Sequence, residues 1–134
     1  MTIVLVVDPN SDTRYRLQSD LVNSNQFERV LCCEGFAAAK PILESFLVKV
    51  MLLDAALAQD QTTLKTIKDE FPALGVVILQ DTNITLDLDA LQDLGAHAQA
   101  SRLASPMELM ASVAKALVAR LRPSTKILRK LLKD

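Results

Sequence analysis

Two aspartates that each follow an apolar run are the residues of this chain best placed to do chemistry. Asp8 follows Ile3–Val7, and Asp54 follows Val48–Leu53. Short continuous apolar runs rich in Val, Ile and Leu are typical of parallel strands covered on both faces. Because ligands bind at the carboxyl ends of the strands in open α/β sheets, both carboxylates are expected on one edge, within reach of a ligand or a phosphoryl group.

The elements that must position these acids follow from the hydrophobic pattern, which alternates between continuous runs and helical spacing. The continuous runs are Ile3–Val7, Val30–Cys33, Val48–Leu53, Val76–Leu79 and a weaker one near Ala98–Ala100. Helical spacing follows Ser11 and recurs over Ala37–Phe46, Thr62–Glu70, Leu86–Leu94 and Met107–Leu121. Such alternation indicates βαβ units. We therefore predict an α/β domain with a doubly wound sheet of five parallel strands, two helical layers and five helices.

Residues typical of helix starts and ends support these boundaries. Ser11 is expected to cap the first helix, and Ser105 the fifth, with Pro106 at its first position. Gly95 is expected to end the fourth helix. Pro41 lies inside the second helical pattern, so that helix either starts late or is kinked.

Length and composition indicate one globular domain. The chain has 134 residues, half of them hydrophobic, and its apolar runs are far shorter than the ~20 residues of a membrane span. A basic leader with a cleavage site is not visible at the amino terminus. Cys32 and Cys33 are adjacent on a predicted strand, so they point to opposite faces and are expected to be reduced. We expect a cytoplasmic protein.

The net charge of −1 conceals an uneven distribution of acids and bases along the sequence. From residue 115 onward there are seven bases and one acid, against 8 bases and 15 acids before it. The body should therefore repel nucleic acid. We divide the chain into a domain over residues 1–122 and a basic amphipathic helix over 123–134. That tail either packs on its own domain or a second copy, or binds a membrane surface, nucleic acid or a partner's groove.

The order of these features resembles the receiver domain of two-component response regulators over residues 2–121. Asp8 matches the first metal-binding acid, and Asp54 matches the phosphoacceptor. Leu94-Gly95-Ala96 and Ser105-Pro106-Met107-Glu108-Leu109 are also similar to the family. The resemblance implies a flavodoxin-like fold, here with an extra C-terminal helix, and a bacterial phosphorelay in which the aspartate attacks a phosphoryl donor beside Mg²⁺.

Five positions depart from the family pattern. Pro9 replaces a second metal-binding acid, and Arg102 replaces the usual lysine. Gln80 stands where receivers have Thr or Ser, Gln99 at the switch aromatic, and Leu103 at a proline. Of the signature residues, Asp8 and Asp54 remain.

These departures predict an altered site. Mg²⁺ prefers an octahedral set of oxygen ligands, so Pro9 should weaken metal binding at Asp8 and Asp54. The amide of Gln80 is able to donate to Asp54. The planar guanidinium of Arg102 is able to meet Asp54 with two parallel hydrogen bonds. We hypothesise a site held in one state, with Asp54 neutralised by Arg102.

Two further polar residues have open interpretations. His97, the only histidine, is expected at the surface or the sheet edge rather than on a metal. Asp81 is either a turn residue before the fourth helix or an addition to the acidic cluster.

The function predicted from these residues is a stand-alone, receiver-like signalling module that acts through protein contacts at the last two helices and the fifth strand. Its partner would be a histidine kinase, a downstream effector or a second copy, without membrane or nucleic acid. A Gly-rich phosphate cradle is absent, which argues against a nucleotide-dependent enzyme, and a Ser-His-Asp set cannot be assembled, so we do not expect an enzyme. One alternative is an ordinary phospho-accepting receiver with a weakened Mg²⁺ site. Another is the regulatory domain of a nucleic-acid-binding protein that uses the basic tail.

Overall fold

A computed structural model of the chain describes residues 2–81, 89, 92 and 95–121. The helix expected over Leu86–Leu94 lies mostly outside these residues, and the C-terminal helix expected over 123–134 lies entirely outside them. The division of the chain at residue 122 therefore stays a prediction.

Five parallel strands form one sheet in the order β2-β1-β3-β4-β5. The strands are β1 (Thr2–Val7), β2 (Phe27–Cys33), β3 (Val48–Asp54), β4 (Gly75–Gln80) and β5 (Ala98–Ser101). This is the flavodoxin-like order, in which the ligand-binding edge lies at the switch point between β1 and β3. The predicted sheet is confirmed, with every strand at the expected place and one to three residues longer.

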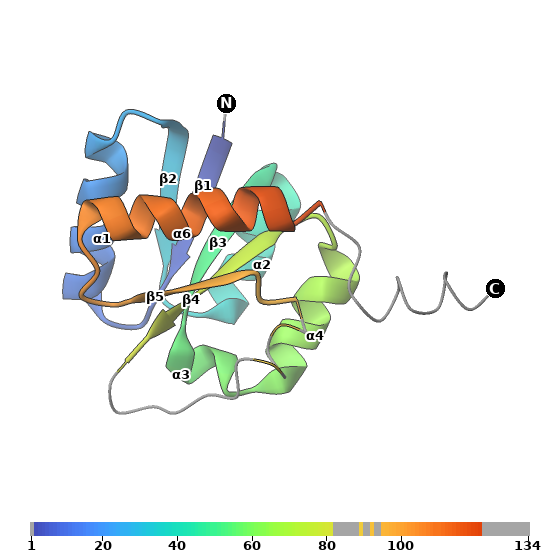
Figure 1. Cartoon of the computed structure of the whole chain (residues 1–134). Coiled ribbons are helices and arrows are strands. Elements are labelled where there is room, and N and C mark those ends of the chain that lie inside the picture. Colours follow the sequence, from blue (N-terminus) through green and yellow to red (C-terminus); the bar gives the residue numbers. More distant parts are fainter. Residues whose placement is uncertain (1, 82–88, 90–91, 93–94, 122–134) are drawn as a thin grey trace.

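Helices cover both faces of the sheet (Figure 1). α1 (Ser11–Asn23) and α6 (Pro106–Ala119) pack on one face. The other face is covered by α2 (Phe36–Ser45), α3 (Ala55–Ala58) and α4 (Gln61–Glu70). The three-layer prediction is confirmed. The short α3, which begins directly after Asp54, was not predicted.

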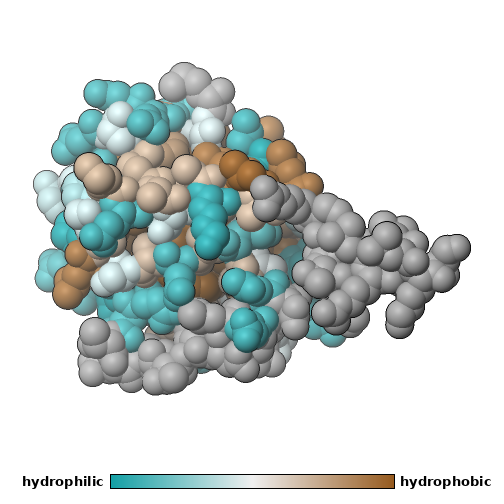
Figure 2. All heavy atoms as spheres, in the orientation of Figure 1, coloured by the Kyte–Doolittle hydropathy of each residue, from teal (hydrophilic) through white to brown (hydrophobic). Residues whose placement is uncertain are grey.

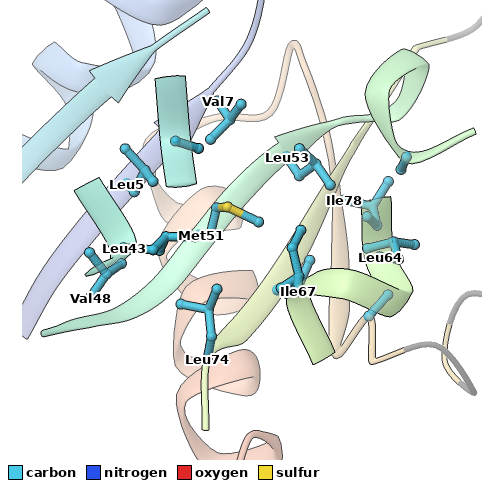
Figure 3. Packing of buried hydrophobic residues seen from close by; sticks show 14 of the residues in the cluster. Leu5, Val7, Leu43, Val48, Met51, Leu53, Leu64, Ile67, Leu74 and Ile78 are labelled. Carbon is cyan, nitrogen blue, oxygen red and sulfur yellow. The ribbon is translucent and has the colours of Figure 1, made fainter. Parts of the chain in front are cut away.

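Side chains alternate along each strand, so the sheet divides the apolar residues into two buried cores. Leu5 and Met51 lie in the core beneath α2 and α4 (Figure 3). Their neighbours Val4 and Val50 lie in the core beneath α1 and α6. Burial on both faces explains why the strands read as unbroken apolar runs.

The adjacent cysteines follow the same alternation. Cys33 packs against the first core and Cys32 against the second, and both are free thiols. Burial raises the pKa of each thiol above its ordinary value. The prediction that they face opposite sides is confirmed.

The helix boundaries correct one expectation and exclude one of two alternatives. The side chain of Asn10, and not of Ser11, caps α1 by accepting from the Thr13 N–H at 3.0 Å. Asn10 has the extended backbone that an N-cap needs, whereas Ser11 is already helical. Pro41 lies inside α2, which begins at Phe36, so a late start is excluded.

The predicted start of α6 is confirmed, whereas the helix that Gly95 was predicted to end lies mostly outside the described residues. The hydroxyl of Ser105 accepts from the Glu108 N–H at 3.2 Å, and Pro106 opens α6. Gly95 has a φ of +103°, the left-handed conformation expected of a glycine that ends a helix.

His97 belongs to the frame of the sheet. Its side-chain Nδ1 accepts from the Val76 N–H at 3.1 Å, and its backbone N–H donates to the Val76 carbonyl at 2.8 Å. Burial, assisted by Lys68, lowers the pKa of the imidazole and so favours the neutral form that accepts this bond. His97 is therefore half-buried beside the edge strand β5 and extends the β4–β5 pairing.

Among the described residues, no helix has the length and apolar character needed to cross a membrane.

Gly75, the first residue of β4, gives a direct test of this packing. A Cβ there would lie 2.9 Å from the Ala116 carbonyl oxygen of α6, so Gly75→Ala must push a helix backbone away. We expect the free energy of unfolding to fall by about 1–3 kcal/mol in urea titrations. The control is Gly35→Ser, because a Cβ at Gly35 meets nothing within 4 Å. Equal stability of Gly75→Ala and the unchanged protein would show that α6 is not this close to β4.

Candidate functional site

Four charged residues lie at the carboxyl end of the sheet. Asp54 is the last residue of β3, while Asp8, Asp81 and Arg102 come directly after β1, β4 and β5. The Arg102 guanidinium lies within 4 Å of all three carboxylates. The predicted meeting of Asp8, Asp54 and Arg102 on one edge is therefore what the structure shows.

Arg102 binds Asp8 and Asp81 more closely than Asp54. Its Nη2 donates to Asp8 Oδ1 at 3.1 Å and to the hydroxyl of Thr13, also at 3.1 Å. Its Nη1 donates to Asp81 Oδ2 at 3.1 Å. Its Nε lies 3.6 Å from Asp54 Oδ1 and makes no hydrogen bond to it.

The predicted two-bond pairing of Arg102 with Asp54 is therefore wrong. The backbone N–H of Arg102 donates to the Gln80 carbonyl at 3.0 Å, which holds its main chain beside the end of β4. From this position Nη1 of the guanidinium donates to Asp81 and Nη2 donates to Asp8, so that only Nε faces Asp54. One guanidinium shared by three acids cannot give each of them a bidentate pair.

Asp8 is fully buried and strongly held on one side. Its Oδ1 accepts from the Asn10 N–H at 2.8 Å as well as from Arg102. The Asp8 carbonyl accepts from Arg14 Nη1 at 2.7 Å. Its Oδ2 has no hydrogen-bond partner among the described residues. The Asp8 carboxylate thus stabilises the turn from β1 into α1 and links it to Arg102.

Asp54 is also buried, with 3% of its surface exposed, but it is held less well. Within the described part of the chain its Oδ1 lacks a hydrogen bond. Burial raises the pKa of the carboxyl, and the charge of Asp8 raises it further. Arg102 and a hydrogen bond from the Ala56 backbone oppose that rise in pKa without cancelling it. Arg102 therefore only partly neutralises Asp54.

Gln80 and Gln99 bind each other and do not reach the carboxylates. Gln80 Nε2 donates to Gln99 Oε1 at 3.0 Å on an exposed surface. Alternation along β4 places Gln80 on the face of Ile78, whereas Asp54 belongs to the face of Leu52. The expected hydrogen bond from Gln80 to Asp54 is therefore absent, since the two side chains leave the sheet on opposite faces.

Three residues of the site were missed or left open by sequence reasoning. Asp81 joins the acidic cluster through Arg102. Its position, two residues after Leu79, already placed it on the face that Asp8 and Asp54 share. Thr13 and Arg14 enter from the first turn of α1, and only their nearness to Asp8 in the sequence pointed to them.

The site fits a magnesium ion poorly. Asp8 Oδ2 and Asp54 Oδ1 are open oxygens, but Pro9 adds no side-chain ligand. The Nε of Arg102 already lies 3.6 Å from Asp54 Oδ1. Among the described residues, no group of three or more His, Cys, Asp or Glu side chains is arranged to hold a metal. Octahedral coordination would depend on two carboxylates beside a fixed cation.

Comparison with known proteins identifies the fold. No protein-family model matches the chain, and no curated protein matches its sequence. Solved structures do match, among them the response regulator RcsB of Salmonella typhimurium, with 21% identity and a TM-score of 0.76 over 100% of this chain and 71% of that one.

Two receiver domains match over almost their full length. The N-terminal signal receiver domain of a two-component response regulator from Bacteroides fragilis has 20% identity and a TM-score of 0.73, over 87% of this chain and 97% of that one. The signal receiver domain of an HD domain-containing protein from Pseudomonas fluorescens has 23% identity and a TM-score of 0.74, over 89% and 88%. At these identities the likeness shows the receiver fold.

The unequal support of the two buried aspartates predicts opposite effects of the same substitution. Asp8→Asn weakens a charge-assisted hydrogen bond to Arg102, so the free energy of unfolding at pH 7 should fall by about 2 kcal/mol. Asp54→Asn removes a carboxylate whose ionisation is opposed in the folded state, so the same quantity should rise.

The pH dependence follows from the sign of the Asp54 shift. Its folded-state pKa lies above the ordinary value of 3.8, so its ionisation costs stability as the pH rises through that raised pKa. The gain from Asp54→Asn should therefore be present at neutral pH and vanish as the pH approaches 3.8. Urea titrations across this range measure it, and a loss of stability in Asp54→Asn at pH 7 would refute the asymmetry.

Proposed function

We propose that this chain is a receiver-like signalling module that acts through protein contacts and does not depend on phosphorylation of Asp54. One observation carries the proposal. The Arg102 guanidinium is hydrogen-bonded to Asp8 and Asp81 and lies 3.6 Å from Asp54. A side chain of the protein thus supplies positive charge at the edge where the receivers that this chain resembles are expected to use a metal ion.

The charge balance of the edge supports the proposal. Asp8, Asp54 and Asp81 share the single charge of Arg102. A phosphoryl group on Asp54 would add roughly −1.5 to −2 charges beside the other two acids. Arg14 lies nearby, but it donates to the Asp8 carbonyl and is 3.7 Å from Glu34. Without a divalent cation, phosphorylation would therefore add repulsion that Arg102 cannot fully offset.

The proposed contact surface is the region around β5 and the start of α6. Gln99 and Gln80 form a polar pair there. Leu103 and Met107 are each 83% exposed, an arrangement suited to a protein partner. A signalling partner, either a kinase or a downstream effector, is the proposed occupant. No catalytic role is proposed for the chain itself.

A second candidate function is a phospho-accepting receiver with a weakened Mg²⁺ site. The observation in its favour is the pair of buried carboxylate oxygens, Asp8 Oδ2 and Asp54 Oδ1, that lack hydrogen bonds among the described residues. A cation between them would satisfy both, provided that the Nε of Arg102 moves away from Asp54.

Labelling from a small-molecule phosphodonor separates the two functions. With Mg²⁺ present, we expect the unchanged protein to incorporate no more phosphate than Asp54→Asn, because Pro9 removes a ligand and Arg102 occupies the edge. Intact-mass spectrometry measures incorporation. Robust, Mg²⁺-dependent labelling that Asp54→Asn abolishes would establish the second candidate instead.

A combined variant provides the positive control. Pro9→Asp restores the second acid, and Arg102→Lys replaces the fork with a single ammonium. If these two residues block the chemistry, the double variant should gain Mg²⁺-dependent labelling at Asp54. Beryllofluoride with Mg²⁺ should likewise perturb the double variant and leave the unchanged protein unaffected.

A further inference from the structure

α6 carries an apolar stripe on the side that faces solvent. Met107, Ala111, Ala114, Val118 and Leu121 are all exposed, at alternating spacings of four and three residues. Such spacing places them in one row along a helix. We call these five residues the α6 stripe. Figure 2 shows the apolar colours along the line of α6, deepest towards its C-terminal end.

The domain's own core does not need this stripe. The opposite side of α6, with Leu109, Val113 and Ala116, is fully buried against the sheet. A helix that is apolar both towards the core and towards solvent is typical of one covered by a further element. The side chains of Ala111 and Ala114 in the middle of the stripe are small, so another helix can pack there with about 8 Å between the two helix axes.

The helix that carries the stripe ends close to the end of the stripe. α6 stops at Ala119, Arg120 is its C-cap, and Pro123 follows closely in the sequence. Proline lacks the N–H that would continue the helix and restricts the residue before it. Arg120 Nη1 also donates to the Ala73 carbonyl at 2.9 Å, which holds the end of α6 against the body. A straight extension of α6 into residues 124–134 is therefore disfavoured.

The sequence of residues 124–134 is complementary to the α6 stripe. Ile127, Leu128, Leu131 and Leu132 fall on one side at helical spacing. The basic residues fall on the other side: Lys126, Arg129, Lys130 and Lys133. A helix this short is marginal alone, so it needs an apolar surface to form.

We propose that residues 124–134 dock on the α6 stripe as an antiparallel helix, with their basic side facing solvent. This inference does not rest on the proposed signalling function, and it leaves Met107, at the other end of the stripe, available to a partner. Eleven residues of helix are about 16 Å long, enough to run back from Leu121 to near Ala111. The four residues 120–123 between α6 and this segment make a connection of the usual length between antiparallel helices.

The tether favours this occupant over a second copy of the chain. Short flexible links give effective concentrations of about millimolar, whereas a second copy must bind from dilute solution. Charge favours docking of this segment on the domain, in the same chain or in a second copy, because the residues before 115 carry a net −7 and those from 115 onward +6. Glu108 and Lys115, the charged residues of α6, lie beside the stripe and not within it.

Amide hydrogen exchange of the full chain, followed by mass spectrometry, tests the docking. We expect residues 127–132 to exchange at least about ten-fold more slowly than an unstructured peptide. Ala114→Glu should abolish that protection, because it places a charge in the middle of the stripe. The matched control is Ala38→Glu, at an exposed position of α2, which should leave the protection unchanged.

A charge-swap variant distinguishes direct contact from loss of folding. Ala114→Glu combined with Leu131→Lys should recover part of the protection, whereas an unfolded α6 would not recover. Exchange of residues 127–132 at the unstructured rate, or protection that survives Ala114→Glu, would overturn the proposal. So would protection that requires high protein concentration, which indicates a second copy, or protection that requires anionic phospholipid vesicles.

Discussion

The ion pair between buried Asp8 and Arg102 is the interaction on which the site depends. Asp8 is fully removed from water, and a buried carboxylate is strongly unfavourable without a hydrogen-bonded partner. Arg102 provides that partner at 3.1 Å and also bonds Thr13 and Asp81. The pair therefore connects the end of β5 to β1, α1 and β4. Breaking it would leave an uncompensated charge inside the fold.

This use of the guanidinium decides the state of Asp54. Because Arg102 donates to Asp8 and Asp81, Asp54 receives only a charge at 3.6 Å. Burial and the neighbouring Asp8 raise its pKa more than Arg102 and the Ala56 backbone lower it. An edge that in many α/β sheets binds a ligand is here largely occupied by an internal network. That network is the physical basis for proposing signalling without phosphorylation.

α6 links the two ends of the domain. Its start, capped by Ser105, follows the loop that carries Arg102, and its end is held to the Ala73 carbonyl through Arg120. One side of the helix completes the core beneath β4 and β5, and the other side exposes the α6 stripe. A partner that binds near β5 and a segment that covers the stripe would therefore contact the same helix.

The sequence alone determined the architecture and the location of the site. Continuous apolar runs predicted all five strands, and the acids after the first and third of them predicted the edge where Asp8 and Asp54 meet. Ser105 and Pro106 predicted the start of α6, and the glycine at position 95 is compatible with the left-handed conformation found there. These are local signals, set by periodicity and backbone preference over a few neighbouring residues.

Only the tertiary structure decided which groups bind each other. In the structure Arg102 donates hydrogen bonds to Asp8 and Asp81 and not to Asp54. Gln80 binds Gln99, and Asp81 and Thr13 belong to the site. The cap of α1 is Asn10 and not Ser11. These outcomes depend on the direction in which each side chain leaves its strand. They also depend on whether two atoms lie 3.1 or 3.6 Å apart, in residues up to 94 positions apart in the sequence. Composition and spacing do not encode such geometry, because it arises only when distant segments pack together.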